Sequence, residues 1–213
     1  MKKIFLAGII GLAGVAVQAG IIWNFDTPAS MPASIEKFGY IYVDTNSAAA
    51  GKGIQGSKAL ELTIPARTRS WGGGLALVPA KPINLASPST TAWVYVSVAA
   101  DAPNPFGISL EVSDNSGGNA FIPSPGPYAA SGQKLAGKIK PAFQTVAFDL
   151  RTFDRYGAAT GKPNLAAITK IRWIFPDNTP GATGPLHIYL DNVGASTNAP
   201  VPVELTAPKP KQK

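Results

Sequence analysis

Two acidic residues near opposite ends of the chain, Asp26 and Asp191, are the pair best placed to act together. Each lies toward the end of a segment with the composition of a β-strand, Trp23–Asp26 and Ile188–Val193. If these first and last strands pair, the carboxylates come close together, and two neighbouring carboxylates need a cation or a proton between them. The sequence therefore predicts a structural cation site where the chain ends meet. The alternative is that Asp26 caps a turn and Asp191 bonds nearby backbone amides.

Side chains that support catalysis are scarce. The chain has no cysteine and a single histidine, His187, which alternates with Ile188 and Leu190 and is expected on the outward side of a strand. Nucleophilic catalysis needs a base beside a nucleophile, glycoside hydrolysis needs two carboxylates across a cleft, and transition-metal hydrolysis needs clustered histidines. Most acids of the folded region fall in turns, with Glu61 and Glu111 as the main exceptions. We therefore expect a protein that is not an enzyme.

Outward-facing aromatic and polar side chains suit sugar binding better. Pyranose rings pack their C–H faces on flat aromatic rings, while a few polar groups bond the hydroxyls. Arg172 faces outward if Trp173 faces the core, and there it could bond hydroxyls or pair with Glu111. The candidate ligand-binding residues are Trp71, Trp93, Tyr95, Glu111 and Arg172.

The three aromatic candidates each have an alternative role. Trp71 precedes three glycines that could leave its ring exposed, but the same ring could cover an edge of the fold. Trp93 and Tyr95 could form a stacking platform, or the proline-rich segment 122–128 could cover them and make a small satellite core. The sequence leaves both alternatives open.

The sequence segments that position these residues have the alternating pattern of β-strands. Apolar residues alternate with polar or aromatic ones, and turn-forming Gly, Pro, Asn, Asp and Ser separate the runs. The prolines of segment 123–127 begin a long loop through Lys140, because proline removes the hydrogen-bond donors that a strand needs. About nine short strands with turns between them predict an all-β fold, a β-sandwich of two antiparallel sheets. Besides the first segment, Trp23–Asp26, the expected strands are Ala59–Ile64, Trp93–Val98, Ile108–Val112, Phe38–Val43, Gly74–Val78, Thr145–Leu150, Ile171–Phe175 and Leu186–Val193, which contains the last segment.

Both chain ends fall outside the predicted sandwich domain of residues 20–197. A basic start (Lys2 and Lys3), an apolar stretch and small residues form an export signal over residues 1–19. The apolar stretch is shorter than the ~20 residues needed to cross a bilayer, so we expect a secreted or periplasmic protein that does not span the membrane. Residues 198–213, rich in proline and lysine, are expected to form a disordered tail. The net charge of +7 is not accompanied by the arginine and aromatic stripe typical of nucleic-acid binding.

Six motifs follow one another along the chain: Trp23-Asn24-Phe25-Asp26, Gly56–Leu60, Trp71–Leu75, Trp93–Val98, Phe143–Leu150 and Ile188–Val193. Their order resembles the galactose-binding-like jelly rolls of bacterial carbohydrate-binding modules. The resemblance covers nearly all of the processed chain and implies an antiparallel two-sheet jelly roll. It also implies a structural calcium ion, Ca²⁺, held by Asp26 and Asp191 with backbone carbonyls near Gly56 and Lys58, since calcium accepts 6–8 oxygen ligands in loose geometry. The Glu-x-Asp-x-x-Glu arrangement of jelly-roll glycanases is absent from the sequence.

The expected function is non-catalytic binding of a polysaccharide or cell-surface glycan. The main alternative is an extracellular structural or adhesive domain that holds another protein, because one scaffold can serve unrelated functions. A glycan binder should line a groove on one sheet with aromatic rings, whereas an adhesive domain should present a flatter apolar patch. A third alternative, an atypical polysaccharide-active enzyme, would need two carboxylates facing each other across a sheet.

Overall fold

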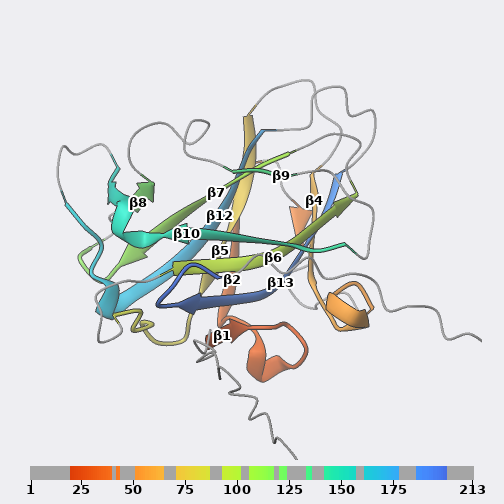
Figure 1. Ribbon diagram of the computed structural model, residues 1–213, viewed down its shortest axis with the longest axis horizontal. Helices are drawn as coiled ribbons and strands as arrows, with labels where there is room; N and C mark the ends of the chain where they lie inside the picture. Colours follow the sequence, from red (N-terminus) through yellow and green to blue (C-terminus); the bar gives the residue numbers. More distant parts are fainter. Residues whose placement is uncertain are drawn as a thin grey trace, which may run out of the picture.

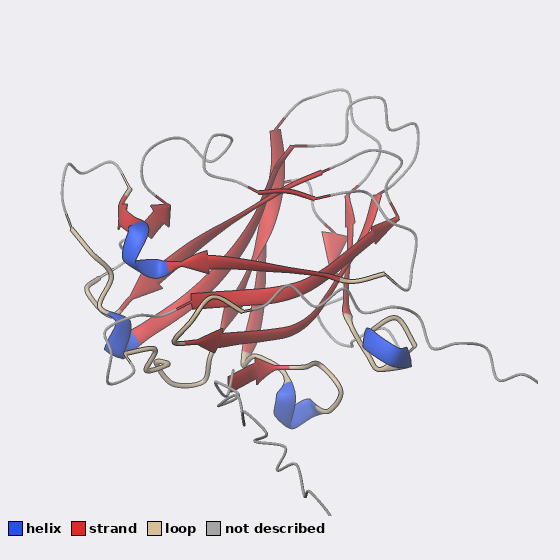
Figure 2. Ribbon diagram, viewed as in Figure 1, coloured by secondary structure: helices blue, strands red, loops and turns tan. Residues whose placement is uncertain are grey.

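The structure, a computed structural model, describes residues 20–39, 42–43, 51–64, 71–86, 93–101, 106–117, 120–123, 133–135, 142–156, 161–177 and 186–200. These residues form two antiparallel sheets with short 3₁₀ helices at their margins (Figure 2). In Figure 1 the strands β10, β6 and β13 run across the molecule, and β12 and β5 of the other sheet cross them steeply. The prediction of an all-β, two-sheet jelly-roll sandwich is confirmed.

Sheet A contains both the first and the last strand. Its order is β10-β6-β13-β4-β3, and β1 pairs with β13. Its strands are β1 (Gly20–Trp23), β3 (Tyr42–Val43), β4 (Leu60–Ile64), β6 (Trp93–Asp101), β10 (Gln144–Asp149) and β13 (Leu186–Ser196).

Sheet B packs against sheet A and has the order β11-β8-β7-β12-β5-β2, with β9 pairing β7. Its strands are β2 (Ser34–Gly39), β5 (Trp71–Val78), β7 (Phe106–Asp114), β8 (Ala120–Pro123), β9 (Gln133–Leu135), β11 (Phe153–Arg155) and β12 (Ile168–Asp177). The 3₁₀ helices are η1 (Pro28–Ser30), η2 (Ile54–Gly56), η3 (Leu150–Thr152) and η4 (Leu165–Ala167).

The period-two pattern decides which side chains enter the core. Successive side chains of a strand point to opposite faces, so Ile171, Trp173 and Phe175 of β12 are fully buried between the sheets while Arg172 points outward. Trp173 packs against Phe148 of sheet A, with ring centroids 6.3 Å apart. The core placement expected for Trp173 is confirmed, and with it the outward direction of Arg172.

The chain ends lie side by side in sheet A, as predicted. β1 pairs antiparallel with β13, placing Gly20 opposite Ala195 and Ile21 opposite Gly194. Along the same edge, β4 pairs with residues 186–190 of β13. β13 therefore changes partner from β4 to β1 near Asp191, and this change of partner opens the space in which the candidate cation site lies.

Three expectations about individual strands are wrong. The run Phe38–Val43 is not one strand: β2 ends at Gly39 in sheet B, and β3 begins at Tyr42 in sheet A. A glycine offers no side chain to pack and often marks such a bend. β9 lies inside the segment expected to be loop from residue 123 to 140, because a strand of three residues is too short to show alternation. β1 ends at Trp23, before Asp26.

The export signal of residues 1–19 lies outside the described residues, as does the tail beyond Pro200. Both remain predictions. Within the described part of the chain, no helix is long and apolar enough to cross a membrane.

Candidate functional site

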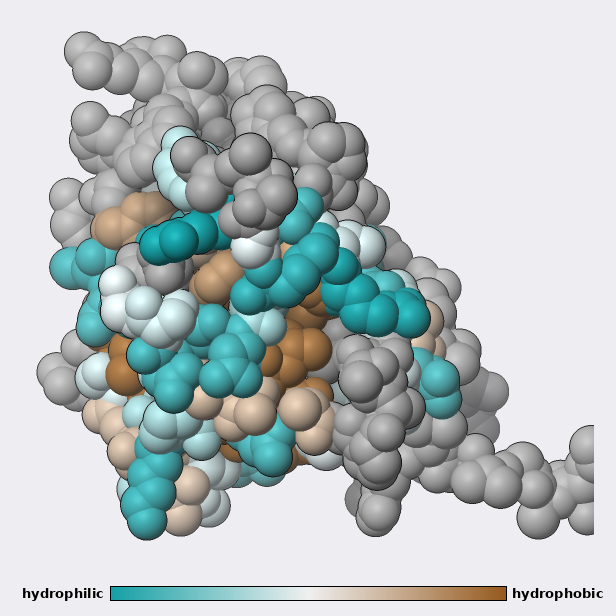
Figure 3. All heavy atoms as spheres, turned by 90° about the vertical axis from the view of Figure 1, so that its left-hand side faces the viewer, coloured by the Kyte–Doolittle hydropathy of each residue, from teal (hydrophilic) through white to brown (hydrophobic). Residues whose placement is uncertain are grey.

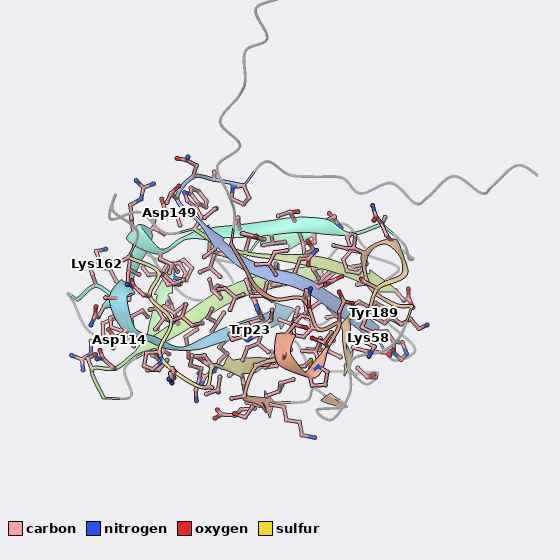
Figure 4. All side chains as sticks on the ribbon, turned by 90° about the horizontal axis from the view of Figure 1, so that it is seen from below. Trp23, Lys58, Asp114, Asp149, Lys162 and Tyr189 are labelled. Atoms are coloured by element: carbon pink, nitrogen blue, oxygen red, sulfur yellow. The ribbon has the colours of Figure 1, made fainter. Side chains whose placement is uncertain are left out.

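Asp26 and Asp191 meet in the space where β13 changes partner. Asp191 lies on the outer face of sheet A, opposite Ser97 of β6, and the loop around η2 lies over it. Lys58, whose backbone bonds Asp26, and Tyr189 of β13 mark this end of the sandwich in Figure 4, far from Asp114 and Lys162 at the other end.

The η2 loop holds both carboxylates through adjacent residues. Asp191 Oδ2 accepts hydrogen bonds from Ile54 N at 2.9 Å and from Ser57 Oγ at 3.0 Å. The Lys58 N–H donates to Asp26 Oδ1 at 3.0 Å. Because Ser57 and Lys58 are consecutive, one turn of chain ties the segment after β1 to the middle of β13.

The electrostatics of the pair favour a neutralising partner. Asp191 is buried, with 1% of its surface exposed. Burial raises the pKa of Asp191, the negative charge of Asp26 raises it further, and hydrogen bonds from Ile54, Asn192 and Ser57 oppose the rise. The charged form of Asp191 is therefore costly here. The cost is removed when Asp191 takes up a proton or when a cation binds beside it.

The backbone at this site is strained. Among the described residues, the non-glycine residues with positive φ are Phe25 (61°), Gln55 (54°) and Asn192 (47°). Phe25 precedes Asp26, Asn192 follows Asp191, and Gln55 lies in η2 between the groups that bond them. Such conformations are unfavourable for residues with a Cβ and cluster at functional sites. All three such residues of the described chain therefore lie at this junction.

Three oxygen atoms pack closely against Gly53. A Cβ at this position would lie 2.3 Å from the Lys58 carbonyl, 2.4 Å from Ser57 Oγ and 2.8 Å from Asp191 Oδ2. Only glycine fits, and the three oxygens around it are hard ligands of the kind that calcium prefers. Within the described chain, no three His, Cys, Asp or Glu residues gather as metal ligands. A cation here would therefore use two carboxylates completed by carbonyl and hydroxyl oxygens, and the donor set fits that description.

The predicted ligand-binding residues do not form one site. Trp93 and Tyr95 lie on β6, on the outer face of sheet A, whereas Glu111 and Arg172 lie on β7 and β12, on the outer face of sheet B. Trp71 begins β5 opposite Asp177, but its side chain lies outside the described residues. Its exposure and role remain a prediction.

Tyr95 is not an open stacking platform. Its ring lies across Gly194 of β13, where an added Cβ would come within 2.3 Å of the ring carbon Cζ and of Oη. This packing leaves 7% of Tyr95 exposed, and the burial raises the pKa of its phenol. Trp93 is half-buried.

The outer face of sheet B joins an aromatic ring to charged groups. Arg172 forms an ion pair with Glu111, its cross-strand neighbour, and its guanidinium lies over the Phe38 ring, 5.0 Å from the centroid. The tip of the Phe38 ring rests on Gly74, where any Cβ would clash with it. We call Phe38, Arg172, Glu111 and Gly74 the ring–arginine cluster.

A second ion pair lies beside the ring–arginine cluster on the same face. Lys170 Nζ is 2.7 Å from Glu36 Oε2, and about half of the Glu36 side chain is exposed. The side chain of Arg172 is 28% exposed, whereas that of Glu111 is 4% exposed. The accessible part of the face is thus the half formed by β2 and β12, and polar groups there can reach a bound molecule.

Sequence reasoning missed Phe38, Glu36 and Lys170 as candidate site residues. Phe38 was assigned only to a strand, and its place beside Arg172 depends on the pairing of β2 with β5. The glycines after Trp71 carried a usable signal, since a glycine within a strand often marks a close approach. Here that approach is made by Phe38 over Gly74.

Solved structures show the class of fold. The carbohydrate-binding module CtCBM11 superposes with a TM-score of 0.57 at 13% identity, over 88% of this chain and 99% of the module. The family 11 module of a cellulosomal cellulase of Clostridium thermocellum gives 0.52 at 13% identity, over 86% and 96%. An exo-β-agarase gives 0.58 at 19% identity, over 84% of this chain and 25% of the agarase, so the chain spans about a quarter of that enzyme. Neither a protein-family model nor a curated protein matches the sequence.

The chain therefore has the β-sandwich fold seen in these carbohydrate-binding modules, as the order of its motifs suggested. It matches the two modules over almost their whole length, so the likeness extends to complete domains and not only to a shared sheet.

Proposed function

We propose that this protein binds polysaccharide through the outer face of sheet B and does not cleave it. The observation that carries the proposal is the ring–arginine cluster, which sets the half-buried ring of Phe38 beside the partly exposed side chain of Arg172. Sugar sites combine such apolar surface with a few polar groups. The likeness to complete carbohydrate-binding modules supports the same conclusion.

Binding without hydrolysis follows from the chemistry of this face. Among the described acids of this face, Glu111, Glu36 and Asp154 are each paired with a cation, Arg172, Lys170 and Lys162 in turn. Hydrolysis needs one carboxylic acid able to donate a proton and a second carboxylate free to attack or to activate water. Each of these carboxylates is engaged by a neighbouring cation, so none is placed for these two roles.

The adhesive alternative is less well supported. Among the large apolar side chains that the structure describes, Ile21 and Tyr156 are the exposed ones. Seen from the end where β8 and β11 lie, hydrophilic residues separate the apolar areas (Figure 3). Protein-binding patches are larger and more continuous.

The junction of β1, β4 and β13 would hold a structural calcium ion. Asp26, Asp191 and Ser57 would supply side-chain oxygens, and the Lys58 carbonyl a backbone oxygen. The ion would neutralise the two carboxylates and fasten the η2 loop to both end strands. Export from the cell, as a secreted or periplasmic protein, agrees with this proposal because extracellular polysaccharide and calcium are then available.

A binding panel tests the function. The protein would be run in affinity gels containing agarose, xylan, cellulose or mixed-linkage β-glucan, beside the variants Phe38→Ala and Arg172→Gln. We expect retardation by at least one neutral polysaccharide and its loss in both variants. Trp93→Ala, on the opposite face, is the matched control and should bind normally.

The same panel discriminates between faces. Binding that survives in Phe38→Ala but is lost in Trp93→Ala or Trp71→Ala would move the site to the residues first predicted from the sequence. Absence of binding to every polysaccharide would overturn the function.

A further inference from the structure

We infer that the ring–arginine cluster selects uncharged polysaccharides and rejects those that carry carboxylates or sulfates. This inference rests on the proposed function and names its class of ligand. The net charge of the chain, +7, would by itself favour acidic glycans. The local arrangement of charge on sheet B instead favours uncharged glycans.

The cations of this face already have anionic partners within the protein. Arg172 pairs with Glu111, and Lys170 pairs with Glu36. The carboxylate of Glu111 cannot turn away into solvent, because only 3% of the residue is exposed. Its negative charge therefore stays beside the guanidinium whether or not a ligand is bound.

An anionic sugar would have to share Arg172 with this fixed carboxylate. The carboxylate or sulfate of the ligand would then lie near a second negative charge, and interfaces use like charges in this way to reject wrong partners. A hydroxyl meets no such penalty. A guanidinium N–H can donate to one sugar hydroxyl while Glu36 accepts from another, leaving both ion pairs in place.

The Phe38 ring adds to the preference for uncharged sugars. It is a half-buried, uncharged surface held against Gly74 by close packing; one side of it faces the Arg172 guanidinium, and a sugar would contact the part of the ring that the guanidinium leaves uncovered. The C–H face of a neutral pyranose packs on such a ring, whereas a hydrated anionic group loses solvation there.

The test compares neutral and acidic polysaccharides at low and high salt. Wild-type protein should bind xylan, agarose or mixed-linkage β-glucan with an affinity that changes little up to about 0.5 M NaCl, where charges are strongly screened. Binding to polygalacturonate or alginate should be at least about tenfold weaker. Equal or tighter binding to the acidic polymers would overturn the inference while leaving polysaccharide binding intact. Failure to bind any polymer would overturn the proposed function itself.

Removing the negative charge of Glu111 tests whether this carboxylate causes the rejection of acidic polysaccharides. Glu111→Gln keeps the shape but frees Arg172 from its counter-charge, so affinity for polygalacturonate should rise by about tenfold and fall again with salt. Asp154→Asn, which removes a carboxylate from the same sheet beside Lys162, is the control and should not change this affinity. If Glu111→Gln fails to fold, the wild-type comparison above decides alone. An unchanged preference in folded Glu111→Gln would overturn the inference.

Discussion

Removal of calcium should lower the thermal stability of this protein, and the effect should depend on Asp191. A ligand that binds only the folded state stabilises it by about 2.7 kcal/mol when its concentration is a hundred times its Kd. For a domain of ~150–250 residues each kcal/mol moves the melting temperature by about 2–4 °C. We therefore expect a rise of about 5–10 °C when calcium in hundredfold excess over Kd is added to chelator-treated protein.

The pH dependence follows from the direction of the pKa shift at Asp191. Its pKa is raised in the folded protein, so without calcium the folded state holds the proton more tightly than the unfolded state. Stability of the calcium-free protein should then fall as pH rises through the folded pKa, because the buried carboxylate becomes charged. The calcium-induced rise should be largest above that pKa and should shrink as protons replace the ion at lower pH.

Differential scanning calorimetry of three proteins provides the assay. Wild type and Asp154→Asn should show the calcium-induced rise, since Asp154 lies on sheet B away from the site. Asp191→Asn should lose it, whatever the melting temperature of this variant in chelator. An equal rise in Asp191→Asn, or no rise in wild type, would refute the assignment of the ion to this junction.

Three further predictions concern stability. Asp114→Asn should cost about 1–3 kcal/mol at neutral pH, because its buried carboxylate accepts bonds from Ser116 and Asn164. Although burial acts to raise the pKa of Asp114, these bonds lower it overall. The deficit relative to wild type should therefore shrink in acid, and urea unfolding at two pH values would show a constant deficit if this reasoning fails. Gly194→Ala should cost about 1–3 kcal/mol by displacing the Tyr95 ring, and a melting temperature equal to wild type would contradict the close contact. Trp173→Ala should cost about 3–5 kcal/mol by emptying the core, and a loss below about 1 kcal/mol in denaturant titration would contradict its burial.

Local pattern predicted the strands well where side chains alternate cleanly. In β12 Ile171, Trp173 and Phe175 are buried while Arg172 points outward, and the long strand that carries Asp191 pairs with the first strand as expected. In β6 the outward residues Tyr95 and Ser97 are buried as well, which the alternation did not predict. The pattern failed at Phe38–Val43, where an unbroken run of strand-forming residues conceals the passage from one sheet to the other.

The candidate glycan site shows why faces are harder to predict than strands. Alternation tells whether Tyr95 or Arg172 points away from the core, but it does not tell which of two outer faces each residue joins. That information lies in strand order, which is set by contacts between distant segments. The five candidates were therefore divided between the sheets, and Phe38 was overlooked although it contacts Arg172.

The meeting of Asp26 and Asp191 was easier to predict because these acids are fixed by the ends of the chain. Asp26 and Asp191 follow from the pairing of β1 with β13. Gly53 and Ser57 do not, since they reach the site through the η2 loop, and loop paths leave little trace in hydrophobic pattern.

The most direct test of the account is a map of backbone amide shifts during titration with an oligosaccharide from a polymer that binds. We predict that the perturbed amides gather on β2, β5 and β12, around Phe38 and Arg172. Perturbations confined to β6 and β10 of sheet A, or spread with no centre, would contradict the assignment of the binding face.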